Sequence, residues 1–119
     1  MNDEKDLRVR TKAFARRVIR LYCALLKNEA VAQVLGKQAL RAGISIGANY
    51  REAYRARSKA EFISKIGDCL KEAGETLYWL ELLLEENILP ARRLQPLLDE
   101  TDELIAVLTT ISKRSKGLE

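Results

Sequence analysis

Apolar residues recur at spacings of three and four along nearly all of this 119-residue chain, with only short breaks between the repeats. Such spacing places apolar side chains on one face of a helix, and no segment shows the two-residue alternation of a half-buried strand. The sequence therefore predicts an all-α fold, an antiparallel up-down four-helix bundle that forms one domain over residues 1–119. We expect its helices at residues 4–27, 30–55, 59–86 and 92–114.

Local signals fix some of these boundaries better than others. Ser58 and Glu61 have the spacing of a capping box, which predicts a helix start after Ser58. Pro90 redirects the chain before the fourth helix, whose start is uncertain because Pro96 is acceptable only in a first turn. The expected core stripes are Leu7, Phe14, Val18, Leu21 and Leu25; Val31, Leu35, Ala39, Ala42, Ile46 and Ala53; Phe62, Ile66, Cys69, Ala73, Leu77, Leu80 and Leu84; and Leu94, Leu97, Leu98, Thr101, Leu104, Ile105, Leu108 and Ile111.

The second predicted helix carries three glycines on one side, Gly36, Gly43 and Gly47. Each interior glycine lowers the stability of a helix by about 1 kcal/mol relative to alanine. Three of them on one side therefore predict that another backbone approaches closely there. We expect this helix to bury two faces, one in its own bundle and one against a neighbouring helix or subunit; alternatively, the glycines kink it or end it early. Apolar residues outside the main stripes also indicate a surface between subunits, namely Leu40, Ile44, Ile63, Leu70 and Leu83.

The sequence offers little to a catalytic or metal site. It has no histidine, so the commonest general base and metal ligand is missing. Its two cysteines, Cys23 and Cys69, lie far apart in apolar helical contexts and are expected to be buried free thiols. Glu72 and Glu75 resemble a catalytic carboxylate pair, but no other acid–base group accompanies them. We therefore expect no enzyme activity, no catalytic residue, no metal and no cofactor.

No apolar run approaches the roughly 20 residues that a membrane-spanning helix needs. The first residues are charged and are followed by no apolar segment, which is unlike a secretory signal. These features predict a cytoplasmic protein without a membrane partner.

Charge is distributed unevenly along the chain. Residues 1–71 carry 16 Lys and Arg against 7 Asp and Glu, whereas residues 72–119 carry 5 against 10. The basic half can bind a polyanion, or basic and acidic faces of neighbouring subunits can meet.

Basic residues at one-turn spacing mark two candidate surfaces for nucleic acid. In the first helix such a row can follow a phosphate backbone, or it can simply be a solvated face. In the second helix arginines alternate with Tyr50 and Tyr54, whose rings can stack on bases or merely cover a helix edge. The candidate nucleic-acid-binding residues are Arg8, Lys12, Arg16, Arg20, Arg51, Arg55 and Arg57.

A second group of polar residues is expected to be structural. Buried polar side chains need partners, and those of the second helix can meet charges of the third. For the two glutamates, a salt-bridged interface with Lys65 or with arginines of the second helix is the better interpretation. The predicted cluster comprises Ser45, Asn49, Glu52, Lys65, Glu72 and Glu75.

Four segments together resemble a known family: ISIGANYREA (44–53), SKAEFISK (58–65), KEAGET (71–76) and YWL (78–80). They are similar to the bacterial four-helix-bundle family encoded in intervening sequences of 23S ribosomal RNA genes. The resemblance implies a ring-shaped homopentamer. It also implies kinship with the accessory protein of diversity-generating retroelements, which binds nucleic acid and a reverse transcriptase. The chain departs from the pattern at Ser64, where many members carry histidine.

Two functions remain open on the sequence alone. One is a non-enzymatic oligomeric scaffold that binds RNA or DNA through basic helix faces, with a reverse transcriptase as a partner by family analogy. The alternative is a structural or protein-interaction module whose charges serve subunit assembly and which touches no nucleic acid.

Overall fold

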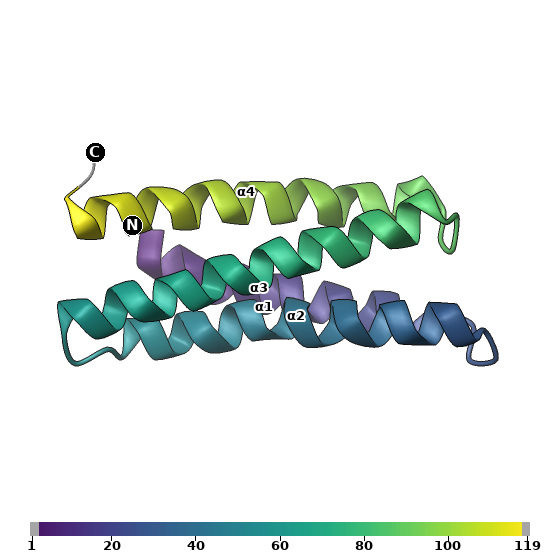
Figure 1. Ribbon diagram of the computed structural model, residues 1–119, viewed down its shortest axis with the longest axis horizontal. Helices are drawn as coiled ribbons and strands as arrows, with labels where there is room; N and C mark the ends of the chain where they lie inside the picture. Colours follow the sequence, from purple (N-terminus) through teal and green to yellow (C-terminus); the bar gives the residue numbers. More distant parts are fainter. Residues whose placement is uncertain (1–2, 118–119) are drawn as a thin grey trace.

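The computed structural model describes residues 3–117 of the chain, with side chains from Leu7 onward. Four helices make up this part: α1 (Asp3–Cys23), α2 (Ala30–Tyr54), α3 (Lys59–Glu85) and α4 (Ala91–Lys116). The expected all-α chain of four helices is thereby confirmed, and no strand occurs among the residues described. Figure 1 shows the connections α1–α2 and α3–α4 at one end of an elongated molecule and α2–α3 at the other.

The helices pack in chain order around a shared core. Each contacts the next helix along the chain, and the fourth side is closed by α1 and α4, whose contact is the sparsest. The largest fully buried side chains come from all four helices and include Tyr50, Phe14, Leu80 and Leu104. Burying one such side chain stabilises the fold by about 1.5–3 kcal/mol. Tyr50 therefore belongs to the core, and the expectation that it lies beside the arginines on the surface was wrong.

The glycines of α2 face α1 of the same chain. A Cβ atom added to Gly43 would meet Val18 Cγ2 at 3.0 Å, and one added to Gly47 would meet Thr11 Oγ1 at 3.2 Å. At Gly36 it would collide with Leu25. The close approach that the glycines predicted is real, but α1 occupies this flank. The sequence left a neighbouring helix or a subunit open for this flank, because periodicity cannot say which neighbour a helix face meets, and the neighbour is the helix α1.

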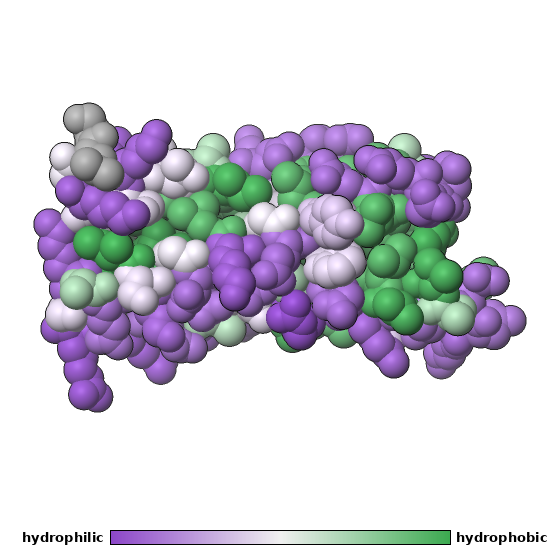
Figure 2. Space-filling view, viewed as in Figure 1, coloured by the Kyte–Doolittle hydropathy of each residue, from purple (hydrophilic) through white to green (hydrophobic). Residues whose placement is uncertain are grey.

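The apolar residues expected between subunits do not form one free surface. Leu83 is fully buried, and Leu40 and Leu70 pack against the core. Ile44 is exposed, and Ile63 is half-buried. Val31, predicted to lie in the core, is 60% exposed, because Ala32 one position further on turns into the bundle instead. Figure 2 shows apolar surface along the α3–α4 side of the visible face and at the end where α2 begins.

The end of α1 and the position of Pro96 within α4 differ from the prediction, whereas the other helix ends agree with it to within two residues. Helix α1 ends at Cys23 and not at residue 27, because shorter turns follow: the Leu25 amide donates to the Tyr22 carbonyl at 3.1 Å. Leu25 nevertheless remains in the core. Helix α4 begins at Ala91, which places Pro96 in its second turn and not in its first. The position is exposed, so water can serve the carbonyl that loses its helical donor.

The start of α3 follows the capping signal closely. The Ser58 hydroxyl accepts a hydrogen bond from the Glu61 amide at 3.1 Å. The Glu61 carboxylate reaches back and accepts one from the Arg57 amide at 3.0 Å. These bonds fix the turn between α2 and α3 and therefore the end of α2, where part of the candidate site lies.

Candidate nucleic-acid interface

A groove of about 600 Å³ lies between α1 and the C-terminal part of α2. Arginines and a lysine from both helices line it, together with Tyr54 and the small apolar side chains of Val9 and Ala13. No acidic residue is among the described residues that line it. The basic lining residues are Arg8, Lys12 and Arg16 of α1 and Arg51 and Arg55 of α2.

Helix geometry and the glycine contact together create this arrangement. Residues four apart lie on one side of a helix, so α1 and α2 each present a basic row. The two rows come together because Thr11 lies directly against Gly47, where no side chain separates the helices. The sequence spacing predicted each row separately, and the fold brings the rows to one groove.

Arg8 and Tyr54 form the end of the groove. The guanidinium carbon Cζ of Arg8 lies 3.9 Å from the centroid of the Tyr54 ring, a cation–π contact. The Nε atom of Arg8 is buried and has no hydrogen-bond partner among the described residues. The Tyr54 side chain remains 45% exposed. The pair thus presents an aromatic ring and a planar cation together at the groove.

The five groove cations form no ion pair with any described carboxylate, although other cations of the chain do. Arg10 of α1 pairs with Glu100 and Glu103 of α4, each at 2.7 Å. The hydrogen bonds that Arg10 donates to Glu100 raise the pKa of Arg10 and lower the pKa of Glu100. Acidic residues of the C-terminal half therefore neutralise Arg10 and leave the groove charged.

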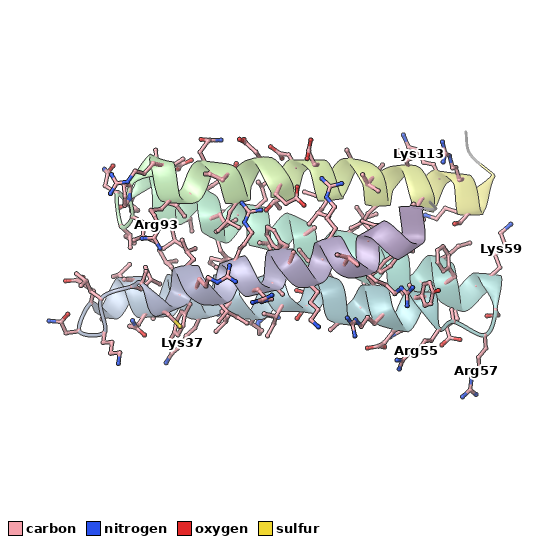
Figure 3. All side chains as sticks on the ribbon, turned by 180° about the vertical axis from the view of Figure 1, so that it is seen from behind. Lys37, Arg55, Arg57, Lys59, Arg93 and Lys113 are labelled. Atoms are coloured by element: carbon pink, nitrogen blue, oxygen red, sulfur yellow. The ribbon has the colours of Figure 1, made fainter. Side chains whose placement is uncertain are left out.

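Two of the predicted nucleic-acid residues lie elsewhere. Arg20 lines a separate hollow of about 190 Å³ between α1 and α4, with Arg17 and Arg93. Arg57 lies in the turn before α3, and Figure 3 shows its side chain pointing away from the bundle, beyond Arg55. The structure thus brings five of the seven predicted residues to one groove and places the other two outside it.

The predicted polar cluster divides into separate interactions. The Ser45 hydroxyl donates to the Arg41 carbonyl at 2.6 Å, and the Asn49 amide donates to the Ser45 carbonyl at 3.0 Å, so both serve their own helix. Glu52 pairs with Lys65 at 2.7 Å, and the hydrogen bond raises the pKa of Lys65.

Arg41 supplies the charge for the remaining two residues of the cluster. It lies 3.2 Å from Glu75 and 3.8 Å from Glu72. The sequence interpretation expected an arginine of the second helix here but did not name Arg41. The signal that could have found it is the pair of glutamates on one side of α3, which needs a cation opposite.

The cysteines show no arrangement for chemistry. Cys69 is buried, its thiol lies 3.6 Å from the Ile46 carbonyl oxygen, and burial raises its pKa to about 12. Cys23 is exposed, so the prediction that both thiols are buried was wrong for this one. The early end of α1 explains the difference, since Cys23 is its last residue.

The residues described contain no group of three or more His, Cys, Asp and Glu side chains that could hold a metal ion. Over the same residues, no helix combines the length and the apolar character needed to span a membrane.

Comparison with known proteins places the chain in a family. A family model described as 23S rRNA-intervening sequence protein matches residues 5–110. The chain belongs to this family. Membership confirms the resemblance that the central segments indicated, and it extends that resemblance to nearly the whole sequence.

A solved structure agrees with this assignment. The chain is similar to a protein of unknown function from the S23 ribosomal protein family of Bacteroides thetaiotaomicron VPI-5482, known from a crystal structure. The two are 40% identical, the match covers 92% of this chain and 97% of the other, and the TM-score is 0.85. No curated protein matches the chain.

Proposed function

We propose that this member of the 23S rRNA-intervening sequence family is a non-enzymatic scaffold that binds the backbone of RNA or DNA through the α1–α2 groove. The observation that carries the proposal is the convergence of five cations, none paired with a described carboxylate, on a groove without an acidic residue in its described lining. Phosphate contacts of this kind release counterions, which gives affinity without a base-reading motif.

In this proposal the antiparallel up-down bundle of residues 1–119 is one subunit of a cytoplasmic, ring-shaped homopentamer. The family resemblance supports the ring, and exposed apolar side chains such as Val31, Val34 and Tyr78 supply surface that a neighbouring subunit can cover. A ring would present several copies of the groove, so modest affinity at one groove would rise by avidity. A reverse transcriptase remains a candidate partner on the strength of family kinship.

A salt-dependent binding titration tests the proposal. Fluorescence anisotropy of a labelled RNA, measured at several salt concentrations, should show an affinity that falls linearly on a log–log scale. Combined reversal of three groove charges (Lys12→Glu, Arg16→Glu and Arg51→Glu) should weaken binding at every salt concentration. It should also reduce the slope by about 1 for each phosphate that the variant no longer neutralises.

Exposed lysines outside the groove provide a matched control. Lys37→Glu, Lys59→Glu and Lys113→Glu change the net charge equally, and Figure 3 shows these residues spread over both ends of the molecule. This triple variant should keep most of the affinity and slope. Equal losses in both triple variants would mean that net charge, and not the groove, attracts the nucleic acid.

A second function is favoured by the acidic face of α4. Asp99, Asp102 and Glu103 are exposed there, and such a face can meet the basic groove of a neighbouring chain. In that case the charges would serve assembly alone. Light scattering in low and high salt separates the two functions, because an assembly held by these charges would dissociate in high salt. An assembly that keeps its mass in high salt, while its affinity for RNA falls, would show that the charges serve the nucleic acid.

A further inference from the structure

We propose that the α1–α2 groove accepts an unpaired nucleotide of a single strand, whose base stacks on the Arg8–Tyr54 pair while its phosphates contact Lys12, Arg16 and Arg51. This inference rests on the proposed nucleic-acid binding, and it adds the class of nucleic acid and the way the base is held.

The first argument is the position of Tyr54. One helical turn before it, Tyr50 is fully buried in the core, whereas Tyr54 is 45% exposed and lines the groove. The ring therefore adds little to the core of its own bundle. Aromatic side chains beside a basic groove are the usual platform for stacking bases, because every base has a π-face.

The second argument concerns the contacts of the Arg8 side chain. Its guanidinium lies over the Tyr54 ring, and its buried Nε donor has no partner among the described residues. A buried donor without an acceptor lowers stability. A ligand can supply that acceptor only when the Arg8 side chain shifts to expose its Nε atom. Bases stack on arginine planes as well as on aromatic rings, and both bases and phosphates carry acceptor oxygens.

The third argument is the shape of the groove. Its volume of about 600 Å³ lies within the range of pockets that enclose small molecules, roughly 300–1,000 Å³. A base turned out of a strand, with its phosphates, can enter such a space. A duplex keeps its bases stacked inside and offers only phosphates, so it would contact the rim of the groove alone.

Binding of matched oligonucleotides tests the inference. An unstructured single strand of about 12 nucleotides and the blunt duplex of the same length are titrated against the wild type, Tyr54→Phe and Tyr54→Leu. The wild type should bind the single strand more tightly. Tyr54→Leu should weaken that binding about 5- to 150-fold, the equivalent of 1–3 kcal/mol for one stacked base, and leave duplex binding unchanged.

Two conservative variants, Tyr54→Phe and Arg8→Lys, give the test its controls. Tyr54→Phe keeps the ring and should retain single-strand affinity within about twofold, since stacking needs no hydroxyl. Arg8→Lys keeps the charge but removes the planar group, so it should weaken the single strand more than the duplex. Circular dichroism checks that each variant is folded, and the exposure of Tyr54 makes the fold tolerant of its replacement.

The outcomes separate the two proposals. Unchanged single-strand binding by Tyr54→Leu, in a protein whose binding is abolished by charge reversal at Lys12, Arg16 and Arg51, would overturn base stacking and leave backbone binding intact. Absence of any oligonucleotide binding would overturn both. Adenosine monophosphate should compete only weakly with the single strand for the groove, because it offers a single phosphate. If the mononucleotide bound as tightly as the single strand, the assignment of the groove to a strand would be overturned.

Discussion

Arg10 of α1 forms a bidentate ion pair with Glu100 of α4, in which Nε lies 2.7 Å from Oε2 and Nη2 lies 2.9 Å from Oε1. The pair bridges the two helices with the sparsest contact in the bundle. Its carboxylate is well shielded, with the Glu100 side chain 16% exposed, whereas the Arg10 side chain is 34% exposed. The pair therefore closes the first helix against the last at a point where few apolar contacts do so.

We predict that Glu100→Gln lowers the free energy of unfolding by about 1 kcal/mol at neutral pH. Charge-assisted hydrogen bonds contribute about 1.5–3 kcal/mol, and the exposure of Arg10 reduces that figure through solvent screening. The pKa of Glu100 is below its ordinary value of 4.5, so this stabilisation is complete above that value and is lost as the pH falls through the lowered pKa.

Urea unfolding of both proteins at pH 7 and over a series of acidic pH values checks this prediction. The difference in the free energy of unfolding should shrink once the pH falls through the lowered pKa of Glu100, where the wild-type carboxyl group also becomes protonated. A difference that stays the same over the whole series would show that packing of the side chain, and not its charge, matters. Arg10 causes no pH dependence of its own in this range, because its pKa is raised above the already high value of an arginine.

The glycine contact between α1 and α2 supports a second prediction. Gly43→Val should destabilise the protein by about 1–3 kcal/mol, the usual cost of overpacking, since even a Cβ atom would lie 3.0 Å from Val18 Cγ2. The matched change Gly67→Val should be neutral or slightly stabilising, because nothing lies within 4 Å of that Cβ position and valine favours a helix over glycine.

Thermal unfolding of the two variants at several protein concentrations provides the measurement. Similar losses in both would mean that the loss at Gly43 is not specific to the α1–α2 contact. A loss at Gly67 that shrinks on dilution would instead place another chain on this face of α3.

Local and long-range features differed in how far the sequence could predict them. The four helices and the cap at Ser58 depend on neighbours in the chain, and periodicity with hydrogen-bonding chemistry was enough. The partner of each helix face depends on tertiary packing. For this reason the sequence left a helix or a subunit open as the neighbour of Gly43, which is Val18 of α1, and it placed the exposed Val31 in the core.

In the candidate site, too, the local features could be predicted from the sequence and the long-range ones could not. Side chains four residues apart differ in direction around the helix axis by about 40°, so Arg8, Lys12 and Arg16 stay near one side. Over three such steps the rotation reaches about 120°, and Arg20 arrives near Arg93 of α4 instead. Equal spacing in the sequence thus predicted a single row, whereas rotation along the helix divides it between two surfaces. The stacking of Arg8 on Tyr54 joins two helices, so no spacing could have predicted it.

Pro96 supports a prediction about stability. It lies in the second turn of α4, where it removes one helical hydrogen bond, and it is exposed. Pro96→Ala should therefore stabilise the protein by about 1–3 kcal/mol, since alanine restores the donor and suits a helix. A change of Gln95 to Ala at the neighbouring exposed position is the control and should have little effect. A lower melting temperature for Pro96→Ala would mean that the proline itself contributes to the start of the helix.

The two cysteines should differ sharply in reactivity. Only a thiolate attacks a disulfide reagent, and Cys69 is buried with a pKa raised to about 12, so at pH 8 it is almost entirely protonated and shielded. Cys23 is exposed at the end of α1. A chromogenic aromatic disulfide should therefore label one thiol per chain rapidly in the native protein and a second only in denaturant. Cys23→Ser should abolish the rapid labelling of the native protein and keep the labelling of one thiol in denaturant. Rapid labelling that persists in this variant would mean that the α2–α3 packing around Cys69 opens far more readily than its burial implies.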